Sequence, residues 1–194
     1  MNDDTAAVLA FLREAGRLKD TERTAWTPGG RRESTAEHSW RLALLAMVLQ
    51  EQAPELDGAK ILKMCLVHDL GEAYEGDISA KANPDPDAKE EAEERAMAQL
   101  LSPLPDGVRR ELYSLWREYN EGVTAEARWV KALDKMETIV THNQGRNPGD
   151  FDYRFNLAYG REYASAHPVL ARLREAVDEE TRERLQRQED SRSR

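Results

Sequence analysis

Apolar positions recur at helical spacing along most of the chain, three or four residues apart. Strand-like alternation with β-branched residues is scarce, and Gly and Pro punctuate the periodic segments, as at Pro28-Gly29-Gly30. The run from Ser34 to Glu37 has the form of a capping box, which marks the start of a helix. The pattern therefore predicts an all-α protein with helices at about residues 3–18, 34–52, 57–69, 87–101, 105–119, 124–143 and 168–188.

Length and composition indicate one domain. The 194 residues are 40% hydrophobic and 34% charged, a balance that supports a packed core beneath a highly charged surface. We expect a single domain over residues 1–194, with its core at about 8–175 and a flexible C-terminal tail at about 186–194. An aromatic-rich connector within residues 145–167 has no role that the sequence reveals.

Cysteine content and charge limit the classes of function. The single cysteine, Cys65, rules out a disulfide framework or a cysteine-based zinc site within one chain. The N-terminus lacks the features of a secretory signal, and no apolar run approaches the roughly 18 residues of a membrane span. The net charge of −9 disfavours binding to a nucleic-acid backbone. We expect a cytoplasmic protein that binds neither membrane nor nucleic acid, although a small anion can bind where a metal ion and arginines make the site locally positive.

Four residues of metal-binding type lie in predicted helices among apolar neighbours: His38, His68, Asp69 and Asp134. His38 precedes leucines four, seven and eleven residues later, so its imidazole is expected to face the interior. A buried charge needs a partner, and one divalent cation bound by two imidazoles and two carboxylates explains all four placements. Taken singly, each histidine also fits a hydrogen-bonded core residue, and Asp134 also fits a buried partner of a nearby Lys or Arg.

The order of these residues resembles a known signature. The segments Ala36-Glu37-His38-Ser39, Leu66-Val67-His68-Asp69 and Lys131-Ala132-Leu133-Asp134-Lys135 are similar to the His…His-Asp…Asp pattern of the HD-domain superfamily. Residues 16–19, 23–26 and 68–78 further resemble a subgroup whose characterised members are 5′-deoxynucleotidases, and the similarity covers roughly residues 8–142. The resemblance implies a distorted bundle of six to eight helices around one divalent metal.

From the same resemblance, His38, His68, Asp69 and Asp134 are the expected metal ligands, and a homodimer is the expected assembly. This ligand set discriminates weakly among first-row metals. The affinity of such a site for divalent metals follows one general order, so the supply of each metal in the cell decides which one is bound. We expect cobalt or manganese, with nickel, iron, zinc and magnesium as alternatives.

The catalytic loop follows the second ligand pair. The resemblance places Glu72 and Asp77 there; Glu72 is expected to orient or activate a water molecule and Asp77 to transfer a proton to the leaving group. The alternative is ordinary solvated loop charge. Residues after Asp77, namely Ile78, Ser79, Ala80 and Lys81, are expected to add substrate contacts, with Lys81 directed at phosphate.

Arg23 and Trp26 are the remaining candidates. An arginine can donate charge-assisted hydrogen bonds to a phosphate, and a tryptophan can pack against a sugar or base. Some relatives place the tryptophan directly after the arginine, whereas Thr24 and Ala25 intervene here, which puts the sugar contact in question. The alternative for both residues is a structural role in a long loop.

Other charged residues are expected to be structural or exposed. His142 and His167 do not form the dense cluster that a second metal would need. The charge run at residues 89–95 is expected to be a solvated helix face with pairing between residues four apart.

The sequence thus predicts hydrolysis of a small phosphorylated substrate, a deoxyribonucleoside 5′-monophosphate. Three alternatives stay open: hydrolysis of a nucleoside triphosphate or phosphodiester on the same fold, a nucleotide sensor without turnover, and a structural oligomerisation domain whose metal only stabilises the fold.

Overall fold

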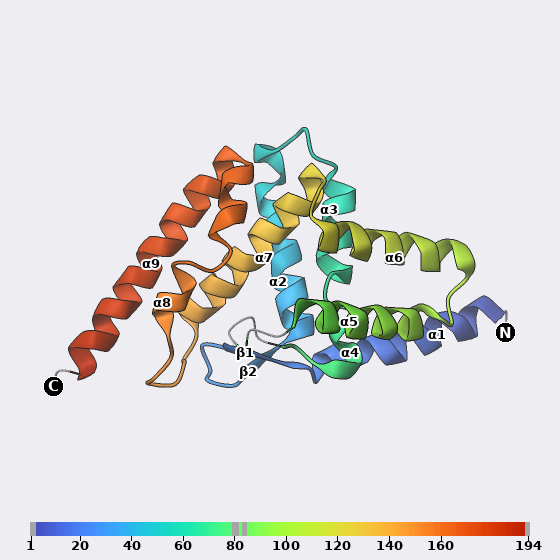
Figure 1. Ribbon diagram of the computed structural model, residues 1–194, viewed down its shortest axis with the longest axis horizontal. Coiled ribbons are helices and arrows are strands. Elements are labelled where there is room, and N and C mark those ends of the chain that lie inside the picture. Colours follow the sequence, from blue (N-terminus) through green and yellow to red (C-terminus); the bar gives the residue numbers. More distant parts are fainter. Residues whose placement is uncertain (1–2, 79–81, 83–84, 193–194) are drawn as a thin grey trace.

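The computed structural model describes residues 3–78, 82 and 85–192. Helices dominate the described chain, which confirms the expected all-α class (Figure 1). None of the described helices is both long and apolar enough to cross a membrane. The elements are α1 (Asp3–Ala15), η1 (Gly16–Lys19), β1 (Glu22–Trp26), β2 (Arg32–Ser34), α2 (Thr35–Leu49), η2 (Gln50–Gln52), α3 (Gly58–Val67), α4 (Glu72–Glu75), α5 (Pro86–Leu101), α6 (Asp106–Glu121), α7 (Ala125–Gln144), α8 (Tyr153–Asn156), η4 (Arg161–Ala166) and α9 (Pro168–Arg192).

Helix α7 lies at the centre of the bundle. It packs against α2, α3, α6, α9 and η4 (Figure 1). Buried residues occur around much of its circumference. Leu133 and Trp129 of α7 and Leu42 of α2 are at most 1% exposed. Full burial of a side chain such as Leu133 contributes roughly 1.5–3 kcal/mol, so this helix anchors the core on which the polar site is built.

A two-stranded hairpin occupies the segment that was expected to be a polar loop. Strands β1 and β2 pair antiparallel, with Glu22 opposite Ser34 and Trp26 opposite Arg32. More residues of β1 than of β2 lie between these pairs, so the register is irregular and β1 is bulged. The intervening turn contains Gly30 at φ +89°, a backbone conformation that glycine adopts without strain. The expectation of a loop was wrong here because the strands are short and gain their stability from pairing.

The start of α2 and the end of α3 place histidines next to each other. Ser34 caps α2, and its side chain and backbone exchange hydrogen bonds with Glu37, which confirms the capping box. His38 follows in the first turn of α2. Helix α3 ends at Val67, so His68 stands at its C-cap and Asp69 lies where the chain leaves the helix.

The connector after α7 is fixed to α9 by a buried arginine. Arg174 donates to the Asp178 carboxylate at 2.7 Å, to the Tyr159 carbonyl at 2.6 Å and to the Asn156 carbonyl at 2.8 Å. These bonds hold α8 and the following turn against α9. Helix α9 continues to Arg192, past the expected end at Gln188.

Candidate active site

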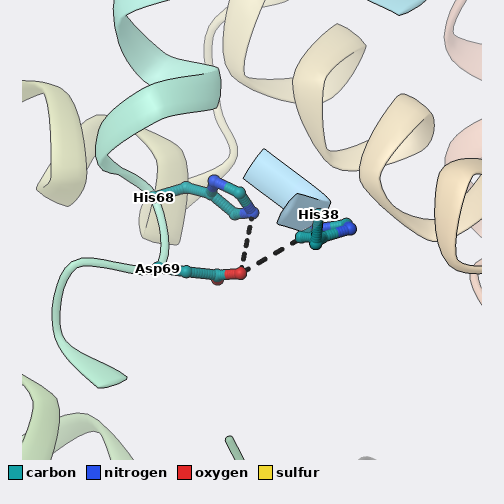
Figure 2. A group of neighbouring side chains, drawn as sticks. All are labelled: His38, His68 and Asp69. Atoms are coloured by element: carbon teal, nitrogen blue, oxygen red, sulfur yellow. Dashed lines mark ion pairs between the residues drawn. The ribbon is translucent and has the colours of Figure 1, made fainter. Parts of the chain in front are cut away.

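The four predicted metal ligands come together at the centre of the molecule. Nε2 of His38 lies 3.1 Å from Oδ1 of Asp134 and 3.9 Å from Oδ2 of Asp69. Nε2 of His68 lies 3.2 Å from that same Asp69 oxygen, and Figure 2 shows both histidines directed at it. All four side chains are largely buried. Residues from α2, α7 and the end of α3 therefore form one compact group of two imidazoles and two carboxylates.

The donor atoms of this group suit a divalent cation. His38 directs Nδ1 at Glu137, with a distance of 2.5 Å to Oε2, and His68 directs Nδ1 at the Cys65 carbonyl at 3.0 Å. Nδ1 therefore carries a proton in each ring, which leaves an Nε2 lone pair facing the centre in the neutral form. Both Nε2 atoms are buried close to carboxylate oxygens, yet neither makes a hydrogen bond of regular geometry within the part of the chain that the structure describes. A cation bound by these nitrogens and by Asp69 and Asp134 would satisfy them.

Proton and metal compete for His38. Burial and Arg23 lower the pKa of the His38 imidazole, but Glu137 and Asp134 outweigh them and raise it to about 10. At neutral pH the metal-free ring therefore holds a second proton on the Nε2 that faces Asp134. Metal binding must release that proton.

Glu72 and Asp77 lie beside the metal group. Glu72 opens α4, is 5% exposed, and accepts a hydrogen bond from the Thr35 hydroxyl at 3.2 Å. Burial, Asp69 and Asp77 raise the pKa of Glu72 well above its ordinary value. Asp77 lines the same polar cavity, so Glu72 and Asp77 are not simply solvated loop charges.

The residues after Asp77 are only partly described. Ile78 lines the polar cavity and is 37% exposed. The candidates Ser79, Ala80 and Lys81 lie outside the described residues.

Arg23 is buried between Asp69 of the metal group and the carboxylate of Glu33. Its guanidinium lies 3.5 Å from Asp69 and 3.6 Å from Glu33, and it donates to the Thr138 hydroxyl at 3.0 Å. Trp26 lies on the same irregular strand, and both residues line one cavity although Thr24 and Ala25 separate them. The irregular pairing explains how a longer spacing still places the arginine and the tryptophan together.

Two neighbouring cavities share Arg23, Asp77 and Tyr159. One, of about 200 Å³, is polar and is lined by three of the four metal-group residues, His68, Asp69 and Asp134. The other, of about 250 Å³, has aromatic walls, in which Trp26 meets Phe151 edge to face with ring centroids 6.0 Å apart. The site therefore has one half suited to a charged group and one suited to a flat apolar ring. The aromatic half is lined by Trp26, Phe151, Phe155 and Tyr159, with Thr138, His142, Pro148, Asp150 and Asp152 among its other residues.

Glu137 contacts the predicted metal ligand His38 on the side of the ring away from the other ligands. The sequence did not single it out. One oxygen of Glu137 faces His38, while the other lies 3.1 Å from Arg41 and accepts from the Thr141 hydroxyl at 2.9 Å. Glu33 lies beside the same hydroxyl, so a buried polar network joins His38 to Arg23. The available signal was the position of Glu137 three residues after Asp134, on the same side of one helix.

The charge run at residues 89–95 is not wholly a solvated helix face. Lys89 and Glu93 form the expected pair, 3.3 Å apart, but both line the polar cavity. The expectation was wrong for these two residues because α4 and the metal group lie against this side of α5, and a run of charged residues hides which of them is covered.

The two other histidines have partners of their own. His142 is buried, lines the aromatic cavity and bonds through Nδ1 to Asn156 at 2.9 Å. His167 lies 3.2 Å from Glu55 and packs edge to face on Trp129. Within the described residues, neither joins a cluster of metal-ligating side chains.

A helical bundle that buries a His, His-Asp and Asp group at its centre defines the HD-domain class of protein. The chain belongs to the HD-domain family, whose sequence profile matches residues 15–174. Among curated proteins it is similar to human 5′-deoxynucleotidase HDDC2, with 35% identity across 86% of this chain and 82% of the human one. It is also similar to 5′-deoxynucleotidase hdd1 of Schizosaccharomyces pombe, with 35% identity across 69% of this chain and 70% of the other.

A solved structure gives the same result. A predicted metal-dependent phosphohydrolase from Magnetospirillum magnetotacticum has a TM-score of 0.78 and 30% identity, covering 93% of this chain and 97% of that one. The expected family is therefore confirmed by sequence and by fold.

Proposed function

We propose that this protein is a metal-dependent 5′-deoxynucleotidase, which hydrolyses deoxyribonucleoside 5′-monophosphates to deoxynucleoside and phosphate. The observation that carries the proposal is the junction of the two cavities at Arg23 and Asp77. A nucleotide bound across it would have its phosphate beside the metal group and its base among aromatic rings. The similarity to proteins named 5′-deoxynucleotidase supports the same substrate.

His38, His68, Asp69 and Asp134 would hold one divalent cation, for which we propose cobalt or manganese. A cation bound there would supply Lewis-acid chemistry, which would polarise phosphate oxygens and lower the pKa of a nearby water molecule. Nickel, iron, zinc and magnesium are the alternatives to cobalt and manganese, because these four ligands discriminate weakly among divalent metals.

Each remaining side chain has a task in the proposed reaction. Arg23 binds a non-bridging phosphate oxygen, because its guanidinium is buried where the phosphate would lie. Glu72 accepts the proton of the attacking water, because its carboxylate is buried in the polar cavity beside the metal group. Asp77 passes this proton on to the departing 5′-oxygen, so that the proton lost by the water ends on the deoxynucleoside. Trp26 packs against the sugar or base, and Ile78 and residues 79–81 complete the phosphate side.

The test is phosphate release from deoxyribo- and ribonucleoside monophosphates, with triphosphates and cyclic dinucleotides included, after chelation and reloading with cobalt or manganese. We expect metal-dependent release from the deoxynucleoside monophosphates. Glu72→Gln should abolish release while metal content stays unchanged. The matched control is Glu75→Gln, an exposed glutamate on the same short helix, which should retain activity. A fully metal-loaded protein that releases no phosphate from any monophosphate would contradict the proposal.

We also propose a homodimer in the cytoplasm. The buried, unpaired Cys65 fits a reducing compartment. On α2, Trp40, Leu44, Met47 and Val48 form an exposed apolar stripe, and Val48 is 75% exposed. A contiguous exposed apolar stripe is typical of an interaction surface, and we propose that a second copy of the chain covers this one. The molar mass in solution should be that of a dimer and should halve in Val48→Glu; a monomeric wild type would contradict this assembly.

A further inference from the structure

Lys131 lies beside the metal group without a role in the proposed reaction. It stands on α7 one turn before Asp134 and lines the polar cavity together with His68 and Asp69. Its Nζ atom sits 4.4 Å from the centroid of the Tyr119 ring, whose hydroxyl donates to Asp134 at 2.7 Å. One tyrosine therefore holds both the lysine and a metal ligand in place.

Lys131 differs from the other lysines of this cavity in its partners. Lys135 lies 2.8 Å from Asp134, and Lys89 lies 3.3 Å from Glu93. No carboxylate oxygen of the described residues lies within 4.0 Å of Nζ of Lys131. Its contact is the face of Tyr119, a weaker compensation for a charge than an ion pair.

Burial makes this ammonium group costly. Burial and Lys135 lower the pKa of Lys131 to about 8, against the opposite effect of Asp134. A partly desolvated cation without an anionic partner is unfavourable, and an anion that enters the cavity relieves the cost. The phosphoryl group of a monoester carries nearly two negative charges at neutral pH, one more than that of a diester.

We propose that Lys131 is a substrate-binding residue that donates a hydrogen bond to a non-bridging oxygen of a phosphomonoester. It approaches the phosphoryl group from α7, and Arg23 approaches it from β1. The identity of the ester rests on the proposed function, but the phosphate contact does not. Lys131 therefore adds a phosphate contact beside the four metal ligands of the HD signature.

The structural alternative is that only the aliphatic part of Lys131 matters. Its side chain packs close to Gly122, where an added Cβ would lie 2.9 Å from Cε of the lysine. Lys131→Met keeps an unbranched apolar chain over Gly122 and Tyr119 but removes the charge. Lys131→Arg keeps the charge. The two variants therefore separate packing from anion binding.

The experiment measures the dissociation constant of inorganic phosphate for the metal-loaded protein by calorimetry. We expect Lys131→Met to weaken phosphate binding about 10- to 100-fold, the loss of one hydrogen bond to a charged group, while metal content and melting temperature stay near wild type. Lys131→Arg should bind phosphate within a few-fold of wild type. Lys63→Met, which removes an exposed lysine paired with Glu111 outside the cavity, is the matched control.

Equal phosphate affinity in Lys131→Met and wild type would overturn the proposal, as would a metal-loaded wild type that binds no phosphate. If Lys131→Met does not fold, Lys131→Gln is measured in its place. A wild type that binds phosphate through Lys131 yet hydrolyses no deoxynucleotide would refute the proposed substrate and leave the phosphate contact supported.

Discussion

Removing the carboxylate behind His38 should weaken metal binding without touching a metal ligand. In Glu137→Gln the side-chain shape stays, but the anionic acceptor facing Nδ1 of His38 is lost. The carboxylate fixes the ring orientation and strengthens Nε2 as a donor, and loss of such a partner typically costs 10- to 100-fold in metal affinity. This corresponds to about 1.4–2.7 kcal/mol of binding free energy.

The pH dependence adds a second, independent signature. Because the pKa of metal-free His38 is raised to about 10, its extra proton is bound at pH 7 and must leave when metal binds. Raising the pH removes this competition, so wild-type affinity should increase by about tenfold per pH unit between pH 7 and 9. In Glu137→Gln the pKa of His38 falls, so the dependence should be shallower and the loss of affinity larger at pH 9 than at pH 7.

The assay is a competition titration of manganese or cobalt against a chelator of known affinity at several pH values. Glu33→Gln is the comparison, because Glu33 lies within 4.8 Å of His38 in the same buried network but has Arg23 and Thr141, rather than the histidine, as its ion-pair and hydrogen-bond partners. Its effect on metal affinity should be smaller. Wild-type affinity and an unchanged pH slope in Glu137→Gln would refute the reasoning.

Three further perturbations test the scaffold and the aromatic cavity. Arg174→Met should destabilise the fold by roughly 3–5 kcal/mol, since it leaves the buried Asp178 carboxylate uncompensated, whereas the exposed Arg172→Met should have little effect in thermal unfolding. Leu133→Ala should lower the free energy of unfolding by about 2–5 kcal/mol in chemical denaturation. A smaller loss would mean that the core around α7 relaxes to fill the space left by the leucine side chain. Trp26→Ala should raise KM for deoxynucleotides about tenfold or more and leave metal affinity unchanged; an unchanged KM would remove Trp26 from the substrate site.

The metal group was accessible from sequence because its signals are local. Two histidines and two aspartates lie at regular positions within apolar helices, where uncompensated polar groups are rare. Their order along the chain then matched a known pattern. The cap at Ser34 was likewise visible, because a capping box is defined by residues three positions apart.

What the sequence hid depends on contacts between distant segments. Arg23 is buried because Thr138, more than a hundred residues later, accepts its hydrogen bond. The bulged strand that brings Trp26 to the same cavity exists only through pairing with β2. Lys89 looked exposed for a similar reason, because a helix with charged residues on several sides does not reveal which side a neighbour covers.

Charge explains how an acidic protein can attract an anion and still exclude larger polyanions. The chain carries a net charge of −9. Four cationic side chains line the polar cavity, namely Arg23, Lys89, Lys131 and Lys135, together with five carboxylates, namely Asp69, Glu72, Asp77, Glu93 and Asp134. A divalent cation at the metal group would make this cavity of about 200 Å³ locally positive, and that field would weaken outside within a Debye length of roughly 10 Å. A single phosphate group can enter this volume and be bound by several cations at once. A nucleic-acid backbone would instead meet the acidic outer surface, so the same charge distribution favours a mononucleotide over a polymer.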